Sequence, residues 1–381
     1  MQSSRERVKS ALLHEEVDRP PQDLGSTCNT SITKIAYKNL LLHLGLYMDR
    51  EPTFLSKAMQ VVEMDEAVLR KLHIDTRGLH SNPPDADMSA VISPDSYVDE
   101  WGIRYRAARS GNEILYFDAV DSPLAAAASC GEIERYRWPD PRDPGRTRGL
   151  REKARAMRDG TECAIVGHMG DTSIFQACIS LRGMERFLLD LASDAKMAQA
   201  LMEMVLEVQL VKMERYLDEV GEYIDVVCIG DDFAGQQAPL ISPALFRASI
   251  KPYLKRYCGL IKRKTSAPLH LHSCGAVRDL LPDLIEIGID IINPIQVSAA
   301  GMDPVVLKKE FGKLLSFWGG IDTQRILPFG TPEDVRNEVM RISRIMGKGG
   351  GYVLNPVHNL QPDVPPRNIL AMYETFFRNQ P

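Results

Sequence analysis

The second half of the chain alternates short apolar runs with longer amphipathic stretches. The runs are rich in β-branched residues and end in polar or Gly residues, at 163–168, 224–230, 268–274, 289–295, 314–320 and 351–356. Short, nearly continuous apolar runs of this kind are typical of parallel strands that are covered on both faces. The pattern therefore predicts six parallel strands in this half of the chain, with helices between them.

Several of these helices have recognisable starts. Ser242, Asp303 and Thr331 each precede a proline, so a side-chain cap is followed by a residue suited to the first helical position. After Ser193, apolar residues recur at helical spacing, namely Met197, Leu201, Met204, Val205 and Val208. We interpret the methionines of this stretch as core packing rather than as a cofactor-binding face.

Two earlier segments complete a set of eight strands. Residues 22–26 follow the first predicted helix, and residues 72–78 follow a helical stretch that begins near residue 53. Eight strands that alternate with helices predict an α/β protein with a (β/α)8 TIM barrel, formed by one domain over residues 1–381. A doubly wound sheet is disfavoured, because no G-x-G-x-x-G follows the first strand. Residues 81–160, rich in Pro, Asp and aromatics, predict a loop and hairpin insertion after the second strand that caps the barrel mouth.

Composition narrows the class of protein. Hydrophobic residues make up 44% of the 381 positions and charged residues 25%, and the formal net charge is -5. This balance is typical of a soluble globular protein and argues against nucleic acid or an anionic membrane as a partner. The 7 cysteines are an odd, sparse set without framework spacing, which favours a reducing compartment. The first residues lack an apolar signal core, and no apolar stretch is long enough to span a membrane, so we expect a cytoplasmic protein.

The functional groups of a (β/α)8 barrel lie at the C-terminal ends of its strands. The predicted strand ends carry more polar groups than a solvated set of loops needs: Asp23, Asp75, Arg77, His168, Asp171, Asp231, Asp232, His272, Cys274, Asn293, Gln296, Asp322 and His358. For each Asp, a helix-capping role has about the same weight as a functional role, because carboxylates at strand ends often cap the following helix.

The sharpest of these signals is the run from His270 to Gly275. Residues two apart share one face of an extended strand, so His270, His272 and Cys274 are predicted to point inward. Imidazole and thiolate groups are suitable zinc ligands, and His358, after the last predicted strand, supplies a further imidazole. Three protein ligands with an open fourth position would be a catalytic arrangement. A lone H-x-C is more often a core pair, and we interpret His270, deeper in the barrel, as a core histidine.

Several long stretches, in the same order, make the chain similar to a known family. They are residues 5–25, 74–78, 180–190, 230–256, 272–296, 317–332 and 349–374. Through them the sequence resembles the uroporphyrinogen decarboxylase superfamily, and within it the cobalamin-dependent methyltransferase branch. The family fold is a (β/α)8 barrel, which agrees with the strand count. Decarboxylases carry an arginine-rich N-terminal segment for the acetate and propionate groups of the porphyrinogen, whereas residues 20–32 here contain no arginine.

The resemblance implies a zinc site. His272 and Cys274 match the H-x-C of the methyltransferase branch, and His358 stands where thiol-methylating members have a third ligand, Cys. A site with one thiolate fewer is a stronger Lewis acid, which favours a methyl donor over a thiol acceptor. The leading hypothesis is therefore a zinc-dependent methyltransferase. It would move a methyl group from a small methylated donor, with a methoxylated aromatic as candidate (O-demethylation), to the cobalt of a corrinoid protein.

This hypothesis assigns roles to the remaining rim residues. Catalytic roles, including protonation of the leaving oxygen, go to Asp75, His168, Asp231 and Asp232, and substrate-binding roles to Asp23, Arg77, Asn293, Gln296 and Asp322. The cobalamin-binding D-x-H-x-x-G signature is absent from the sequence, so we expect the cobalamin (corrinoid) on a separate protein that docks at the barrel mouth. The resemblance suggests a homodimer. Three alternatives stay open: a methylcobalamin:thiol methyltransferase, a uroporphyrinogen-type decarboxylase, and a non-catalytic corrinoid-binding scaffold of this fold.

Overall fold

The computed structural model of the chain describes residues 2–47, 51–170 and 172–377. Its centre is a parallel sheet of seven strands. Each strand of this sheet pairs with the strand of the same sheet that follows it in sequence, as in a barrel. The strands are β4 (Thr76–His80), β9 (Ala164–His168), β10 (Val226–Gly230), β11 (Leu269–His272), β12 (Ile291–Asn293), β13 (Ser316–Ile321) and β14 (Tyr352–Pro356).

An irregular segment near the N-terminus takes the eighth position and closes the barrel. On one side the Asp23 N–H donates to the Leu354 carbonyl at 2.9 Å, and the Leu354 N–H donates to the Pro21 carbonyl at 2.8 Å. On the other side the Asp75 N–H donates to the Gln22 carbonyl at 2.8 Å. The segment thus joins β14 to the start of β4, and the predicted (β/α)8 barrel is confirmed.

The predicted ranges of the strands in the second half overlap β9 to β14, but the second predicted strand is displaced. β4 begins at Thr76 and ends at His80, whereas the prediction covered residues 72–78. Leu72 and Ile74 are buried, which gives the range its apolar pattern, yet they belong to the turn after α3 (Glu66–Lys71). Asp75 therefore precedes β4 and lies at the N-terminal end of the barrel, so its predicted place on the C-terminal rim is wrong.

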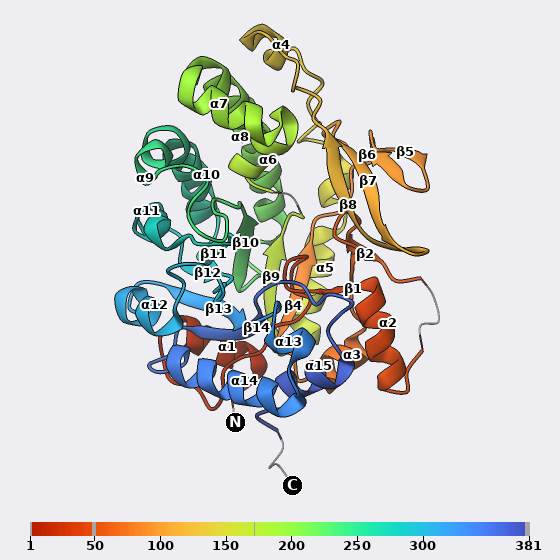
Figure 1. Ribbon diagram of the computed structural model, residues 1–381, viewed down its shortest axis with the longest axis vertical. Coiled ribbons are helices and arrows are strands. Elements are labelled where there is room, and N and C mark those ends of the chain that lie inside the picture. The colour runs from red at the N-terminus through yellow and green to blue at the C-terminus, as the bar shows by residue number, and fades with distance from the viewer. Residues whose placement is uncertain (1, 48–50, 171, 378–381) are drawn as a thin grey trace.

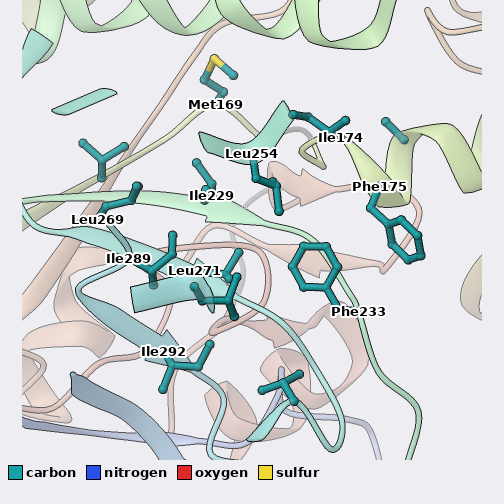
Figure 2. Close-up of a cluster of buried hydrophobic side chains, with 14 of the residues drawn as sticks. Met169, Ile174, Phe175, Ile229, Phe233, Leu254, Leu269, Leu271, Ile289 and Ile292 are labelled. Atoms are coloured by element: carbon teal, nitrogen blue, oxygen red, sulfur yellow. The ribbon is translucent and has the colours of Figure 1, made fainter. Parts of the chain in front are cut away.

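Alternate residues of each strand face the barrel interior and the surrounding helices. In β10, Val226 and Cys228 belong to the interior cluster, together with Val166, Ile291, Trp318 and Val353. Val227 and Ile229 belong to the outer core, beneath the helices. Figure 2 shows part of this outer core, including Ile229, Leu271 and Ile292, together with Phe233 and Phe175, whose ring centroids are 5.6 Å apart. Burial on both faces explains why the strands are apolar along most of their length.

Helices surround the sheet (Figure 1). They are α1 (Ser4–Leu12), α2 (Lys34–His43), α3, α5 (Leu150–Gly160), α6 (Phe175–Arg182), α7 (Met184–Ser193), α8 (Ala195–Val220), α9 (Pro243–Leu245), α10 (Lys251–Lys264), α11 (Leu281–Glu286), α12 (Pro304–Phe311), α13 (Ile326–Phe329), α14 (Pro332–Met346) and α15 (Pro366–Tyr373). The predicted starts are confirmed, since Ser242, Asp303 and Thr331 accept N–H bonds of 3.2, 2.9 and 3.2 Å from their helices. Met197 of α8 is buried in the core, as its helical spacing predicts.

The chain between β4 and α5 forms an antiparallel sheet. Its strands are β5 (Ala90–Ser93), β6 (Ser96–Val98), β7 (Arg104–Ser110) and β8 (Glu113–Asp121), and α4 (Cys130–Glu134) follows. Figure 1 shows it on one side of the barrel strands, and the predicted hairpin insertion after the second strand is confirmed. A second small sheet, formed by β1 (Ile32–Thr33), β2 (Phe54–Ser56) and β3 (Val61–Val62), is linked to β8, because the Phe117 N–H donates to the Ala58 carbonyl at 2.7 Å.

Within the described ranges, no helix combines the length and the apolar character that crossing a bilayer requires.

Candidate metal centre and active site

The three predicted zinc ligands come together at the C-terminal end of the barrel. His272 ends β11, Cys274 follows two residues later, and His358 lies just beyond β14, with their ligand atoms all within 4.8 Å of one another. The Cys274 Sγ is 3.4 Å from the His272 Nε2, and the two imidazole centroids are 5.4 Å apart. Tetrahedral zinc, with bonds of about 2.0 Å to nitrogen and about 2.3 Å to sulfur, separates its ligand atoms by roughly 3.5 Å. The three donors therefore fit zinc in chemistry and in spacing.

A hydrogen-bond chain behind His272 fixes the protonation of its ring. The Asn293 Nδ2 donates to the Trp318 carbonyl at 2.9 Å, which directs the Asn293 Oδ1 toward the His272 Nδ1 at 2.5 Å. The Nδ1 therefore carries the proton, and the Nε2 that faces Cys274 keeps its lone pair for a metal. The parallel register of β11 and β12 places residues 272 and 293 side by side, so this pairing is built into the sheet.

Electrostatics around the three donors keep them neutral. Burial lowers the pKa of His272, and burial with the neighbouring His272 lowers the pKa of His358 to about 4. Burial and the nearby Asp232 carboxylate raise the pKa of the Cys274 thiol well above its usual range. Asp232 also accepts the Cys274 N–H at 2.8 Å and thereby holds the ligand loop. Binding of a metal dication would release the thiol proton, because the ligand is the thiolate.

These ligands border a cavity of about 410 Å³ at the barrel mouth. Its barrel side includes predicted residues from several strand ends, namely His168, Asp231, Asp232, His272 and His358. Its roof comes from the inserted sheet and includes Asp99, Trp101, Ile103, Tyr105 and Ala119. Of the described residues that line it, three are Asp and none is Lys or Arg. The volume suits a small molecule.

Asp231 lines the cavity, but its carboxylate caps a helix. It accepts the N–H groups of Ile174, Phe175 and Gln176 at 3.0, 2.9 and 2.6 Å, which are the first donors of α6. Burial raises the pKa of Asp231 to about 7, against the opposing effect of the three donors. The capping alternative therefore describes this residue, and its contribution to the site is the position of α6, which brings Gln176 and Ser180 to the cavity wall.

Asp75 lies outside this site. It accepts hydrogen bonds from the Arg7 Nη1 at 2.9 Å, from the Arg19 Nη1 at 2.6 Å and from the Gln22 N–H at 2.8 Å. Both guanidinium groups are largely buried with it at the closed end of the barrel. The predicted catalytic role of Asp75 is therefore replaced by a structural one, because its carboxylate is ion-paired at the end opposite the ligands.

Asp23 and Arg77 are also directed away from the cavity. Asp23 is fully buried between strands, where it accepts from the Thr76 Oγ1 at 2.5 Å and from the Trp318 Nε1 at 2.9 Å, and burial raises its pKa. Arg77 forms two hydrogen bonds, of 2.7 and 3.0 Å, with Glu66. It lines a separate cavity of about 730 Å³, on the side of β4 that faces α3 and α5. This larger cavity is lined by none of the three metal-ligand candidates, so we place the site at the smaller one.

The remaining predicted residues support turns near the rim. The Gln296 Oε1 accepts the Gly275 N–H at 2.7 Å, which holds the turn after Cys274. Asp322 accepts the N–H groups of Gln324 and Arg325 at 2.6 and 3.0 Å. These two side chains shape loops, and neither lines the cavity. Asp171 lies outside the described residues.

Sequence reasoning missed the roof of the cavity and part of its wall. Asp99, Trp101 and Tyr105 come from the insertion, and Asn29 comes from the loop after the first barrel segment. Trp101 and Tyr105 lie in the aromatic-rich stretch of the insertion, and that enrichment was the available signal. Asn29 carries no comparable signal, because polar loop residues are common.

The sequence profile of the family described as uroporphyrinogen decarboxylase (URO-D) matches residues 115–378. Uroporphyrinogen decarboxylase of Prochlorococcus marinus (strain MIT 9515) is 26% identical over 174 residues, 42% of this chain and 46% of the relative. That of Chlorobium phaeobacteroides is 25% identical over 187 residues, 48% of this chain and 49% of the relative, so the chain spans about half the length of these relatives. A methyltransferase from Methanosarcina mazei has the same fold, with a TM-score of 0.63, 16% identity, and 99% and 98% of the two chains covered.

Proposed function

Because the chain belongs to the uroporphyrinogen decarboxylase family, we propose that it is a methyltransferase of that family that depends on zinc. It would move a methyl group from a small methylated donor, with a methoxylated aromatic as the candidate, to the cobalt of a separate corrinoid protein. The observation that carries the proposal is the set of His272, Cys274 and His358 at the border of a cavity of about 410 Å³. The fold shared with the Methanosarcina mazei methyltransferase is consistent with it.

The residues of the site have two roles in this proposal: some would bind the zinc, and others position its ligands and the donor. His272, Cys274 and His358 would hold the zinc, which when bound supplies a Lewis acid for the donor oxygen. Asn293 holds the His272 ring in the form that binds metal, and Asp232 holds the backbone of Cys274. The cavity walls position the donor and limit its size.

The proposed transfer balances as an ether cleavage. The carbon–oxygen bond of the methyl ether breaks, a carbon–cobalt bond forms, and its electron pair comes from reduced cobalt(I) of the partner. The leaving oxygen gains a proton. Asp232 lines the cavity beside the ligands, and only one of its oxygens accepts the Cys274 N–H, so it is the group we assign to pass that proton.

The names of the curated relatives make porphyrinogen decarboxylation the second candidate. Its substrate carries acetate and propionate groups, and carboxylates are recognised by cationic side chains, above all by Arg. The described lining of the cavity has no Lys or Arg and includes three aspartates, which repel carboxylates. The charge of the cavity therefore supports a small donor over a porphyrinogen.

The deciding experiment supplies cob(I)alamin and a panel of methyl ethers, methylamines and thioethers to the zinc-loaded protein, with methylcobalamin absorbance as the readout. We expect methylcobalamin from an ether, and loss of the signal in Cys274→Ala. Cys163→Ala, which changes a half-buried thiol outside the site, serves as the matched control and should retain activity.

Other outcomes would contradict the proposal. No methylcobalamin from any donor, together with thiol methylation from methylcobalamin, would establish the reverse direction of transfer. Carboxylate release from uroporphyrinogen without metal would establish a decarboxylase. Absence of both turnover and bound zinc would favour the scaffold.

A further inference from the structure

The walls of the cavity carry a negative charge that methyl transfer itself does not require. The aspartates Asp99, Asp231 and Asp232 line it, and no Lys or Arg is among its described lining residues.

Cationic side chains near the cavity are directed to other partners. The Lys57 Nζ lies 4.2 Å from the centre of the Tyr97 ring. The Lys212 Nζ lies 3.4 Å from a carboxylate oxygen of Glu100, which is also paired with Arg146. Neither lysine is among the described residues that line the cavity.

Asp99 is the acidic group of the roof, and its carboxylate is held in place. It lies in the connection between β6 and β7, where its Oδ1 accepts the Trp101 and Ile103 N–H groups, both at 2.9 Å. The Tyr105 side chain is a further hydrogen-bond partner. Burial raises the pKa of Asp99 to about 6, so the group is mostly ionised at pH 7.5.

Aromatic rings stand beside this carboxylate. Trp101 and Tyr105 line the same roof, and Tyr97 stacks on Tyr105 with ring centroids 4.9 Å apart. This cluster already receives cations, because Lys57 lies over Tyr97 and the Lys212 Nζ lies 5.6 Å from the Trp101 ring centroid. Rings and a carboxylate on one wall are the surroundings that an ammonium group prefers.

We propose that the cavity selects a methyl donor that carries an ammonium group, and that Asp99 is the specificity-determining residue. The ammonium group would lie against the Asp99 carboxylate and the rings of Trp101 and Tyr105. Anionic donors are rejected by like charge. The inference rests on the proposed function only in naming the ligand a methyl donor, since charge selection is a property of the cavity.

The test measures binding rather than turnover, with three para-methoxyphenyl ligands of similar size whose substituents are cationic, neutral and anionic. They are para-methoxybenzylamine, para-methoxybenzyl alcohol and para-methoxybenzoate, titrated calorimetrically into the zinc-loaded protein at pH 7.5. We expect the amine to bind at least about tenfold more tightly than the alcohol, and the benzoate to bind more weakly than either. A tenfold ratio corresponds to about 1.4 kcal/mol, the scale of one partly buried charge contact.

Two variants locate the preference. Asp99→Asn keeps an oxygen for the Trp101 and Ile103 N–H groups, so the fold of the roof is retained while the charge is removed. It should weaken binding of the amine by about tenfold and change binding of the alcohol by less than about twofold. Asp118→Asn removes an exposed carboxylate of β8 and should change neither ligand.

The outcomes separate this inference from the proposed function. Equal binding of the benzoate and the amine would overturn the inference, as would an unchanged preference for the amine in Asp99→Asn. Failure of every donor in the methylcobalamin assay, with the charge preference intact, would overturn the proposed function and leave the selection standing.

Discussion

The two ends of the barrel use the same side chains in opposite ways. At the closed end, the Asp75 carboxylate accepts hydrogen bonds from Arg7 and Arg19 and is fully buried. At the mouth, Asp99 and Asp232 face a cavity whose described lining has no Lys or Arg. A carboxylate that is ion-paired with Arg of its own chain contributes stability, whereas one that accepts hydrogen bonds from neutral groups and faces a cavity keeps its charge for a ligand. The partner, rather than the residue type or its place at a strand end, separates the two roles.

The largest effect we expect is at the closed end. Asp75→Asn should lower the free energy of unfolding by about 3 kcal/mol, because it leaves the largely buried Arg19 guanidinium without its carboxylate and leaves Arg7 paired with Asp18 alone. Urea denaturation measures the loss through the midpoint. Asp118→Asn, at an exposed site, should stay within about 0.5 kcal/mol of the parent. A loss below about 1 kcal/mol for Asp75→Asn would contradict the assignment of this end to stability.

At the mouth, the largest expected effect is on zinc affinity. His358→Ala removes one of three protein ligands, so zinc affinity should fall by more than the roughly tenfold to hundredfold loss typical of an outer partner. Competition with a chromophoric chelator measures the affinity, and urea denaturation of the metal-free protein should show a smaller loss of stability than for Asp75→Asn. Stoichiometric zinc at parental affinity in His358→Ala would remove His358 from the site.

The outer partner of His272 provides the next comparison. Asn293→Ala removes the acceptor of the His272 Nδ1 proton, so the ring is free to rotate or to change tautomer. Zinc affinity should fall by about tenfold to a hundredfold with all three ligands still present. Asn337→Ala, on the exposed face of α14, is the matched control and should bind zinc as the parent does. Unchanged affinity in Asn293→Ala would mean that packing alone orients the ring.

The sequence was informative where local rules apply and silent where distant contacts decide. Spacing of apolar residues located β9 to β14, and the H-x-C of His272 and Cys274 pointed to the metal ligands. The same local rules placed Asp75 on the wrong end, because Leu72 and Ile74 are buried in a turn and imitate a strand. The ion pairs of Asp75 come from residues far away in the chain, so no local pattern could reveal them.

The roof of the cavity shows the same limit. The sequence predicts an insertion that caps the mouth, but which of its side chains reach the cavity, such as Asp99 and Trp101, depends on how the inserted sheet folds over the barrel. The helix-capping role of Asp231 was anticipated as an alternative, but the choice depended on where α6 begins in space.

The smallest predicted effect concerns His80. This residue ends β4, whereas Asp75 directly precedes the same strand at its other end. Burial, with His168 and Lys153 nearby, lowers the pKa of His80 to about 3. In the unfolded chain its pKa is about 6.5, so below that pH the unfolded state binds a proton that the folded state does not. Stability from His80 is therefore complete above about pH 6.5 and is lost as the pH falls toward 3. When the pH is lowered from 7.5 to 5.5, the free energy of unfolding of His80→Gln should fall by about 1.4 kcal/mol less than that of the parent. Urea denaturation of the metal-free protein at both pH values measures the two losses. Equal losses would mean that the pKa of His80 is the same in the folded and the unfolded chain, so that burial at this end of β4 does not disfavour the charged ring.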